Sequence, residues 1–297
     1  MLPELPPVIG IVSVASSPMS MTLLTRGDIQ QLLREHQLTP SRALGQNFLA
    51  DPNTVRRIAR LAAVGPGDRV IEVGAGLGSL TLGLAETGAA VTAVETDRYL
   101  VPILRSVLAA RGADGVDVIE ADAMRLDWAP LLADRHGWSL VANLPYNVAT
   151  PLTLDLLDSV PGIEKMLIMV QREVGERLAA GPGGSAYGAA SVKVAYWAFA
   201  EVVGRVPPSV FIPRPNVESV LVRIQRHPTP AVDPSIVAAD ELFELVRAGF
   251  AQRRKMLRRS LAGVIQPEAF ALAQVEPTAR PEDLDVVAWG RLAACRS

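Results

Sequence analysis

The stretch VIEVGAGLGSLT, residues 70–81, places three glycines between one apolar segment and the start of another. The apolar run before the glycines is nearly continuous, as expected for a parallel strand whose two faces are both covered. Gly74, Gly76 and Gly78 follow the spacing G-x-G-x-G, and glycines at such a turn let the backbone approach a ligand at the start of a helix. The sequence therefore predicts a strand, a ligand-binding loop and a helix, which form the first unit of a doubly wound α/β sheet.

Strand and helix patterns alternate on both sides of this unit. Apolar runs predict strands at 69–73, 90–95, 116–120, 138–142 and 166–170. Helices are expected at about 51–63, 77–87, 97–111 and 149–159. Two later β-like stretches, 202–206 and 219–224, are expected to form a terminal hairpin, and the proline-rich segment 207–215 between them is expected to lack regular structure.

The pattern divides the chain into three parts. Residues 1–20 are expected to form a disordered extension, because their apolar stretch is short and no basic residue precedes it as in a secretory signal. Residues 21–227 form the predicted α/β domain, and the prolines after His227 resemble a linker. Residues 228–297 carry no strand signal and predict a small all-helical domain. No segment has the roughly 20 apolar residues of a membrane span.

Composition limits the classes of function. The chain has 297 residues, 49% of them hydrophobic, and a net charge of −2, so any nucleic-acid surface must be a local patch. The single cysteine, Cys295, excludes a disulfide framework and fits a cytoplasmic protein. The three histidines have no ligand-like spacing to each other or to the cysteine, so no metal site is predicted.

Acidic residues follow the strands on either side of the glycine loop. Glu95 closes the second strand, where a carboxylate can accept hydrogen bonds from both hydroxyls of a ribose. Asp122 follows the third strand, where it could hold an adenine amino group, and Glu72 lies at the end of the first strand. Ser79 occupies the position of the third glycine of a dinucleotide fingerprint. These residues predict a nucleoside cofactor without a pyrophosphate, and S-adenosylmethionine fits best.

A second unusual stretch, LVANLPYNVAT at residues 140–150, ends the fourth strand with an amide, a proline and an aromatic ring. The lone pair of an exocyclic amine is delocalised into its ring, and acceptors around its N–H groups can restore and aim it. The Asn143 side-chain oxygen and the Leu144 carbonyl are candidate acceptors, and Pro145 fixes the backbone between them and Tyr146. Tyr146 offers a face on which an unpaired base can stack. We predict an amine-methylating pocket in which orientation and electrostatics supply the rate.

Several motifs together resemble one family. The stretches GQNFL, GAGLG, NLPYN followed by TPL, VPPSVFIPRPNVESVLVRI and FAQRRKMLRRSL are similar to those of the bacterial small-subunit rRNA adenine N6,N6-dimethyltransferases, the KsgA/RsmA family. The resemblance covers roughly residues 24–290. It implies a Rossmann-like class I S-adenosylmethionine-dependent methyltransferase domain and a helical C-terminal rRNA-binding domain. It also implies dimethylation of two adjacent adenosines in the 3′-terminal hairpin loop of 16S rRNA within the immature 30S subunit.

The resemblance also assigns roles to individual residues. Asn47 and Leu49 in GQNFL would contact the methionine end of the cofactor and close the site. The further cofactor residues that it implies are Gly74, Gly76, Glu95, Asp122 and Asn143. Phe211 stands where related amino-methyltransferases place a second aromatic ring on the base. The sequence departs from the family in the loop expected at residues 181–192, where alanines replace the Lys and Arg of many relatives, so an RNA contact of this loop is doubtful.

A basic run in the C-terminal part is the candidate RNA surface. Residues 211–260 contain nine Arg and Lys against five Asp and Glu. The density is highest at Arg253, Arg254, Lys255, Arg258 and Arg259. At helical spacing, 254 and 258 share a face, as do 255 and 259, which predicts a stripe able to bind rRNA phosphates.

Three other functions stay open at this point. A 23S rRNA adenine methyltransferase of the resistance type would share the pocket, although the helical tail and TPL argue against it. A nicotinamide dehydrogenase lacks support, because the third glycine is missing and no catalytic histidine is evident. A mainly binding 30S assembly factor would not need the intact pocket. Because the ribosomal substrate is large, we expect the chain to act as a monomer.

Overall fold

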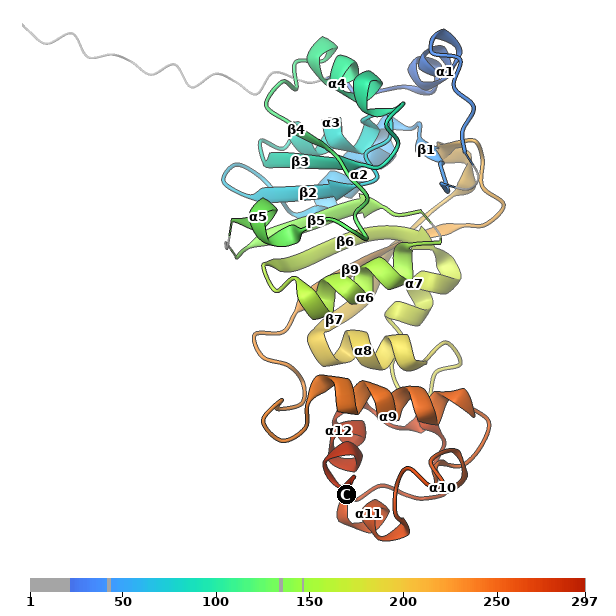
Figure 1. The fold of residues 1–297 in the computed structure, drawn as a ribbon. Coiled ribbons are helices and arrows are strands. Elements are labelled where there is room, and N and C mark those ends of the chain that lie inside the picture. The colour runs from blue at the N-terminus through green and yellow to red at the C-terminus, as the bar shows by residue number, and fades with distance from the viewer. Residues whose placement is uncertain (1–21, 42–43, 134–135, 146, 297) are drawn as a thin grey trace, which may run out of the picture.

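The computed structural model describes residues 22–41, 44–133, 136–145 and 147–296 (Figure 1). The extension predicted at 1–20 and the predicted stacking residue Tyr146 lie outside these residues. The strands are β1 (Phe48–Leu49), β2 (Arg69–Val73), β3 (Ala90–Glu95), β4 (Asp117–Glu120), β5 (Trp138–Asn143), β6 (Ile163–Gln171), β7 (Ala198–Val206), β8 (Phe211–Ile212) and β9 (Ser219–Arg226).

The helices surround the sheet and form the C-terminal end of the molecule. The α-helices are α1 (Arg26–Glu35), α2 (Pro52–Ala62), α3 (Ser79–Ala85), α4 (Val101–Ala110), α5 (Trp128–Leu132), α6 (Ala149–Ser159), α7 (Arg172–Leu178), α8 (Ala189–Trp197), α9 (Ala239–Ala251), α10 (Leu257–Ser260), α11 (Pro267–Leu272) and α12 (Val286–Ala294). Two short 3₁₀ helices are η1 (Pro208–Val210) and η2 (Pro281–Asp283).

Within the described residues the main sheet has seven strands in the order β4-β3-β2-β5-β6-β9-β7. The strands from β4 to β6 are parallel, and β9 runs antiparallel to both β6 and β7. The strand order reverses between β2 and β5, and a doubly wound sheet binds its ligand in the crevice at that point. The predicted α/β fold with a terminal antiparallel pair is therefore confirmed.

The two faces of the sheet bury alternate residues of each strand. On one face, Val70 and Val141 pack in a core with α1, α2, α3 and α4. On the other face, Ile71 and Leu140 pack in a second core with α5, α6 and α7. Covering both faces explains why the parallel strands read as nearly continuous apolar runs.

A third core lies beyond α8, at the end of the molecule formed by α9 to α12 (Figure 1). Tyr187, Val192 and Tyr196 from the α8 region pack in it, whereas Val194 of the same helix packs in the second core under the sheet. The Tyr187 hydroxyl donates a hydrogen bond to the Leu284 carbonyl oxygen at 2.9 Å. Helix α8 thus connects the sheet with the helical C-terminal part, and the predicted boundary at residue 227 stays a prediction.

Some expectations for local structure were wrong. The segment 207–215 contains η1 and the strand β8. Phe211 and Ile212, unlike the prolines that flank them, have backbone N–H groups, and they pair with β1. The stretch 181–192 is not a loop to its end, since α8 begins at Ala189. Helix α1, which the sequence analysis did not predict, begins with a capping box between Thr25 and Asp28.

Candidate active site

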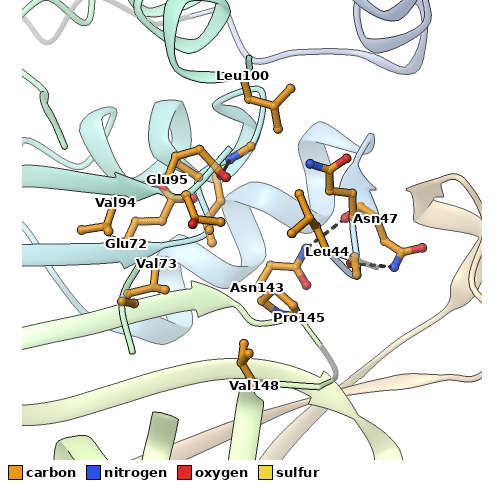
Figure 2. A pocket seen from close by; sticks show the side chains of 18 of the residues that line it. Leu44, Asn47, Glu72, Val73, Val94, Glu95, Leu100, Asn143, Pro145 and Val148 are labelled. Atoms are coloured by element: carbon orange, nitrogen blue, oxygen red, sulfur yellow. Dashed lines mark hydrogen bonds between the residues drawn. The ribbon is translucent and has the colours of Figure 1, made fainter. Parts of the chain in front are cut away.

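A cavity of about 230 Å³ opens at the carboxyl ends of β2, β3 and β5, where the strand order reverses (Figure 2). The segment Leu44–Leu49, which we name the covering segment, forms one wall of the cavity. Most of the residues with a predicted cofactor or catalytic role meet here: Asn47, Leu49, Gly74, Gly76, Glu95, Asp122, Asn143 and Pro145. The cavity is thus the place where the predicted cofactor and target sites adjoin.

The glycine loop lines the cavity with backbone atoms, because Gly74 and Gly76 have no side chains. Gly76 has a φ of +59°, its N–H donates to Glu95 Oε2 at 2.7 Å, and a Cβ at this position would lie 3.2 Å from the Phe48 ring. Gly74 has a φ of +77°, and a Cβ there would contact the Asn143 carbonyl oxygen at 3.6 Å. These left-handed conformations favour glycine, and the loop therefore touches both the covering segment and the end of β5.

Glu95 and Asp122 present carboxylates at the ends of β3 and β4. Glu95 is buried, and its two oxygens accept hydrogen bonds from the backbone N–H groups of Gly76, at 2.7 Å, and Asp97, at 2.9 Å. Burial raises the pKa of the Glu95 carboxyl, while these two donors act to lower it. A carboxylate has about four acceptor positions, so Glu95 can still accept ribose hydroxyls. Asp122 is exposed at the cavity rim, where it accepts from the Met124 N–H at 3.0 Å.

Glu72 is a pocket residue to which the sequence analysis gave no role. It lies in β2, is 1% exposed, and lines the cavity (Figure 2). Its Oε2 has no hydrogen-bond partner among the described residues. Burial, together with the charge of Glu95, raises the pKa of the Glu72 carboxyl to about 8. The available signal was a carboxylate inside the buried strand VIEV, since acids are almost never buried without a partner.

The residues Asn143, Leu144 and Pro145 are held by three separate contacts. Asn143 Nδ2 donates to the Asn47 carbonyl oxygen at 3.1 Å, which leaves the side-chain oxygen as an acceptor (Figure 2). The Leu144 N–H donates to the Met169 carbonyl oxygen at 3.1 Å, and no described N–H group donates to the Leu144 carbonyl. The Pro145 carbonyl accepts from the backbone at the start of α6. Asn143 and Pro145 line the cavity, whereas Leu144 is 2% exposed and is not among the lining residues, so the acceptor role of its carbonyl stays a prediction.

The structure does not bring Phe211 to the cavity. Its side chain is 1% exposed and packs in the core, and its backbone pairs with Leu49 across the β1–β8 sheet. A ring packed in this way has no free face for a base, so the stacking role expected for Phe211 is corrected to a structural one. It anchors the covering segment at the Leu49 end. The stacking role of Tyr146 stays a prediction, because that residue lies outside the described ones.

The basic run does not form the predicted helical stripe. Helix α9 ends at Ala251 and α10 begins at Leu257, so positions 254 and 255 lie in a turn before 258 and 259. The chain turns here because Leu257 is fully buried and its N–H donates to the Ala279 carbonyl oxygen at 2.8 Å. The turn and the adjoining helix α10 nevertheless carry four exposed cations that make no ion pair within the described residues: Arg254, Lys255, Arg258 and Arg259. We name these four residues the basic turn.

Arg253 differs from its neighbours. Its Nε lies 2.6 Å from Glu282 Oε2, and its terminal nitrogen donates to the Ser185 carbonyl oxygen at 2.7 Å. The Gly183 N–H also donates to the Glu282 carbonyl oxygen at 2.7 Å. Arg253 thus joins the 181–185 loop to η2, which is a structural task. Two basic residues of α7, Arg172 and Arg177, also form ion pairs with glutamates on or beside that helix.

Two other classes of site have no counterpart among the described residues. No group of three or more His, Cys, Asp and Glu side chains there is placed to hold a metal ion. No helix there is long and apolar enough to cross a membrane.

Comparison with known proteins identifies a family. The model of the ribosomal RNA adenine dimethylase family matches residues 38–292. A curated relative, ribosomal RNA small subunit methyltransferase A of Kineococcus radiotolerans, is 46% identical over 282 residues, which cover 93% of this chain and 92% of the relative.

Solved structures share the fold. A dimethyladenosine transferase from Plasmodium falciparum superposes with a TM-score of 0.68 at 23% identity, over 82% of this chain and 95% of that one. The 23S rRNA methyltransferase ErmE superposes with a TM-score of 0.63 at 25% identity, over 83% of this chain and 98% of that one. Both likenesses show that the chain shares the fold of these two methyltransferases.

Proposed function

Because the chain belongs to the ribosomal RNA adenine dimethylase family, we propose that it dimethylates the N6 amino groups of two adjacent adenosines in the 3′-terminal hairpin loop of 16S rRNA. The chain is an S-adenosylmethionine-dependent adenine dimethyltransferase of small-subunit rRNA. We further propose that it acts as a cytoplasmic monomer on the immature 30S subunit. The observation that carries the proposal is the orientation of the Asn143 side chain. Its amide nitrogen donates a hydrogen bond to the Asn47 carbonyl oxygen, and its amide oxygen remains an acceptor beside the cofactor pocket.

The residues of the cavity fit S-adenosylmethionine. The carboxyl groups of Glu95 and Asp122 suit the hydroxyl and amino groups of a nucleoside, and Glu72 Oε2, which has no partner among the described residues, can form a hydrogen bond with the ligand. The glycines let the ligand approach the backbone of the loop closely. The residues that would hold the cofactor are Asn47, Leu49, Glu72, Gly74, Gly76, Glu95, Asp122 and Asn143. When bound, the cofactor supplies a methyl group activated by its sulfonium charge.

Asn143 and Leu144 act on the target amine. An adenine N6 amine has two N–H groups, which the Asn143 side-chain oxygen and the Leu144 carbonyl can accept. Accepting both would hold the nitrogen in one orientation and restore lone-pair character that the ring otherwise withdraws. The backbone contacts of Leu144 and Pro145 are already made, so little reorganisation is needed when the amine arrives.

The proton that leaves N6 does not require a carboxylate base. The carboxylates among the described residues lining the cavity are Glu72, Glu95 and Asp122, and they come from the ends of β2, β3 and β4. Asn143 comes from β5, which pairs with β2 and not with β3 or β4. Glu72 on β2 has a pKa raised to about 8, so it keeps its own proton near neutral pH and is not available as a base. Proximity and aligned acceptors therefore supply most of the rate, and the proton can pass to solvent.

The basic turn supports the proposed RNA contact. Its four exposed cations can each meet an rRNA phosphate, and arginine does so with two parallel hydrogen bonds. Figure 1 places α10 toward the opposite end of the molecule from β1, so an RNA that contacts both must extend along the molecule. A folded ribosomal subunit provides such an extended surface.

Two alternative functions can be tested separately. The likeness to ErmE favours testing 23S rRNA as a substrate. A mainly binding assembly role would leave ribosome maturation intact in an Asn143→Ala strain that lacks methylation.

The test is mass spectrometry of rRNA nucleosides from a strain without this gene, complemented with the wild-type or the Asn143→Ala protein. We expect dimethyladenosine to vanish from the 3′ end of 16S rRNA and to return only with the wild-type protein. Loss from 23S rRNA instead, or no loss, would refute the assigned substrate.

A further inference from the structure

The two ends of the covering segment are anchored in different ways. At one end, Phe48 and Leu49 are 7% and 3% exposed and pair with β8. At the other end, Leu44 is 40% exposed, and a second cavity of about 330 Å³ lies behind it, sharing Leu44, Gln46, Phe48 and Leu100 with the first. Hydrophobic burial therefore fixes the Leu49 end but contributes little at the Leu44 end.

Polar contacts of Gln46 fix the Leu44 end. Gln46 Nε2 donates to Asp97 Oδ2 at 2.7 Å, across 51 residues of sequence. Gln46 Oε1 accepts from the Ser41 N–H at 2.7 Å, and the Gln46 N–H donates to the Ser41 carbonyl oxygen at 3.0 Å. Both polar atoms of the Gln46 side-chain amide therefore have a hydrogen-bond partner, which fixes the orientation of the amide.

Asp97 connects this contact to the floor of the pocket. Its Oδ1 accepts from the Tyr99 N–H at 3.0 Å, so only Oδ2 faces Gln46. Its own N–H donates to Glu95 Oε1 at 2.9 Å, and Glu95 Oε2 accepts from Gly76. A chain of hydrogen bonds thus runs from the covering segment through Asp97 to the glycine loop.

We propose that the Gln46–Asp97 hydrogen bond is a clasp that holds the covering segment across bound S-adenosylmethionine and slows the release of the cofactor. Gln46 and Asp97 are then positioning residues, which act through Asn47 and Glu95 rather than on the reacting atoms. The inference rests on the assignment of the cavity to S-adenosylmethionine.

The test uses a pair of isosteric substitutions. Gln46→Glu sets two carboxylates against each other where the amide now donates. Asp97→Asn keeps the acceptor for the Tyr99 N–H, so its new amide nitrogen faces the Gln46 amide nitrogen and two donors meet. In the double variant Gln46→Glu/Asp97→Asn, the introduced amide donates to the introduced carboxylate, which can still accept from Ser41. Each single change breaks the clasp, and the double change rebuilds it with the donor reversed.

The readout is the dissociation rate of labelled cofactor from the full-length protein, without RNA, after a chase of unlabelled cofactor. Hydrogen bonds to charged groups are worth enough that we expect each single variant to release cofactor roughly ten- to a hundredfold faster. The double variant should return to within a few-fold of the wild type.

A matched control is available in α1. Gln31 Nε2 donates to Glu35 Oε1 at the same distance of 2.7 Å, on an exposed face of the helix. Gln31→Glu therefore creates the same carboxylate contact away from the cavity, and it should release cofactor at the wild-type rate.

The outcomes separate the clasp from the proposed function. Single variants that release cofactor at the wild-type rate would overturn the clasp. A double variant that releases cofactor as fast as the faster single variant would also overturn it. This second comparison distinguishes loss of the clasp from poor folding of the single variants. If the wild-type protein itself bound no S-adenosylmethionine, the cofactor assignment would fail together with the clasp.

Discussion

At the scale of single residues, the mechanism that we propose depends on Asn143, because it gives the two polar atoms of the side-chain amide different tasks. The amide nitrogen donates a hydrogen bond to the Asn47 carbonyl oxygen in the covering segment, and the amide oxygen can accept one from the target amine. A chemically similar acceptor, such as an aspartate, would lose the donor and with it the contact to the covering segment. The residue therefore joins cofactor binding to methyl transfer.

Glu72 gives a prediction about pH. Because its folded-state pKa is about 8 and its ordinary value is 4.5, the folded protein keeps a proton that the unfolded chain loses. The stability linked to this proton is complete below about 4.5 and is lost as pH rises through about 8. The free energy of unfolding, measured by urea denaturation without cofactor, should fall with pH across this window more steeply for the wild type than for Glu72→Gln. Equal slopes would show that Glu72 does not titrate in this range.

At the scale of elements, the glycine loop gives a prediction with a matched control. Gly76→Ala places a Cβ 3.2 Å from the Phe48 ring at a φ of +59°, whereas Gly67→Ala at a φ of +92° meets nothing within 4 Å. Both variants should lose roughly 1–2 kcal/mol of stability from left-handed strain. Only Gly76→Ala should also weaken cofactor binding, by about tenfold or more, since it pushes on the covering segment. Calorimetric titration checks this, and equal affinities in the two variants would contradict it.

The elements that the sequence predicted are those with a regular pattern of their own. Strands β2, β3 and β5 lie between covered faces, and their apolar runs were sufficient to find them. Strand β1 has two residues and depends on β8, far along the chain, so no local period reveals it. Helix α8 buries Val194 toward the sheet and Val192 and Tyr196 toward the C-terminal core, so it has no single apolar face to detect.

The site residues also divide into those that a local sequence pattern reveals and those that depend on distant partners. Asn143, Glu95 and the glycines were predictable, because their chemistry is placed at strand ends. The Gln46–Asp97 contact and the burial of Phe211 were not, since both depend on partners distant in sequence. The helical stripe failed because tertiary contacts of Leu257 outweighed the helix propensity of the run around it.

The basic turn gives a prediction about salt. Replacing Arg254 and Arg258 with Glu should weaken binding to the 30S subunit and leave cofactor affinity intact. If each arginine meets one phosphate, the slope of log affinity against log salt should decrease by about 2. The control Arg34→Glu/Arg60→Glu makes the same charge change at two exposed arginines that form no ion pair in the described part of the chain. An unchanged slope in the first variant, or the same change in the control, would remove the basic turn from the interface.

Arg253 should behave differently from its neighbours. Because it pairs with Glu282 and holds the 181–185 loop, Arg253→Ala should lower the unfolding free energy by roughly 1 kcal/mol or less, as for partly exposed pairs. The salt slope of 30S binding should stay at the wild-type value. A slope reduced by about 1 would instead make Arg253 a phosphate contact.

At the scale of the whole molecule, the strands whose carboxyl ends form the pocket and the helix α10, which carries part of the basic turn, lie toward opposite ends of the molecule (Figure 1). Helix α8 packs on both the sheet and the C-terminal helices, and Arg253 reinforces that connection. The two ends are thereby held in one arrangement, which can match two sites on a folded subunit. This accounts for how a protein with a net charge of −2 can select an RNA through local contacts.

The most direct test of the account is the single-turnover rate of methyl transfer to undermethylated 30S subunits at saturating cofactor. We compare the wild type with Asn143→Ala, and with Asn53→Ala on the exposed surface of α2 as the control. Loss of an oriented transition-state contact predicts a rate at least about a hundredfold lower for Asn143→Ala, and no change for Asn53→Ala. An Asn143→Ala protein that dimethylates 16S rRNA at the wild-type rate would contradict the central claim that this acceptor aligns the amine.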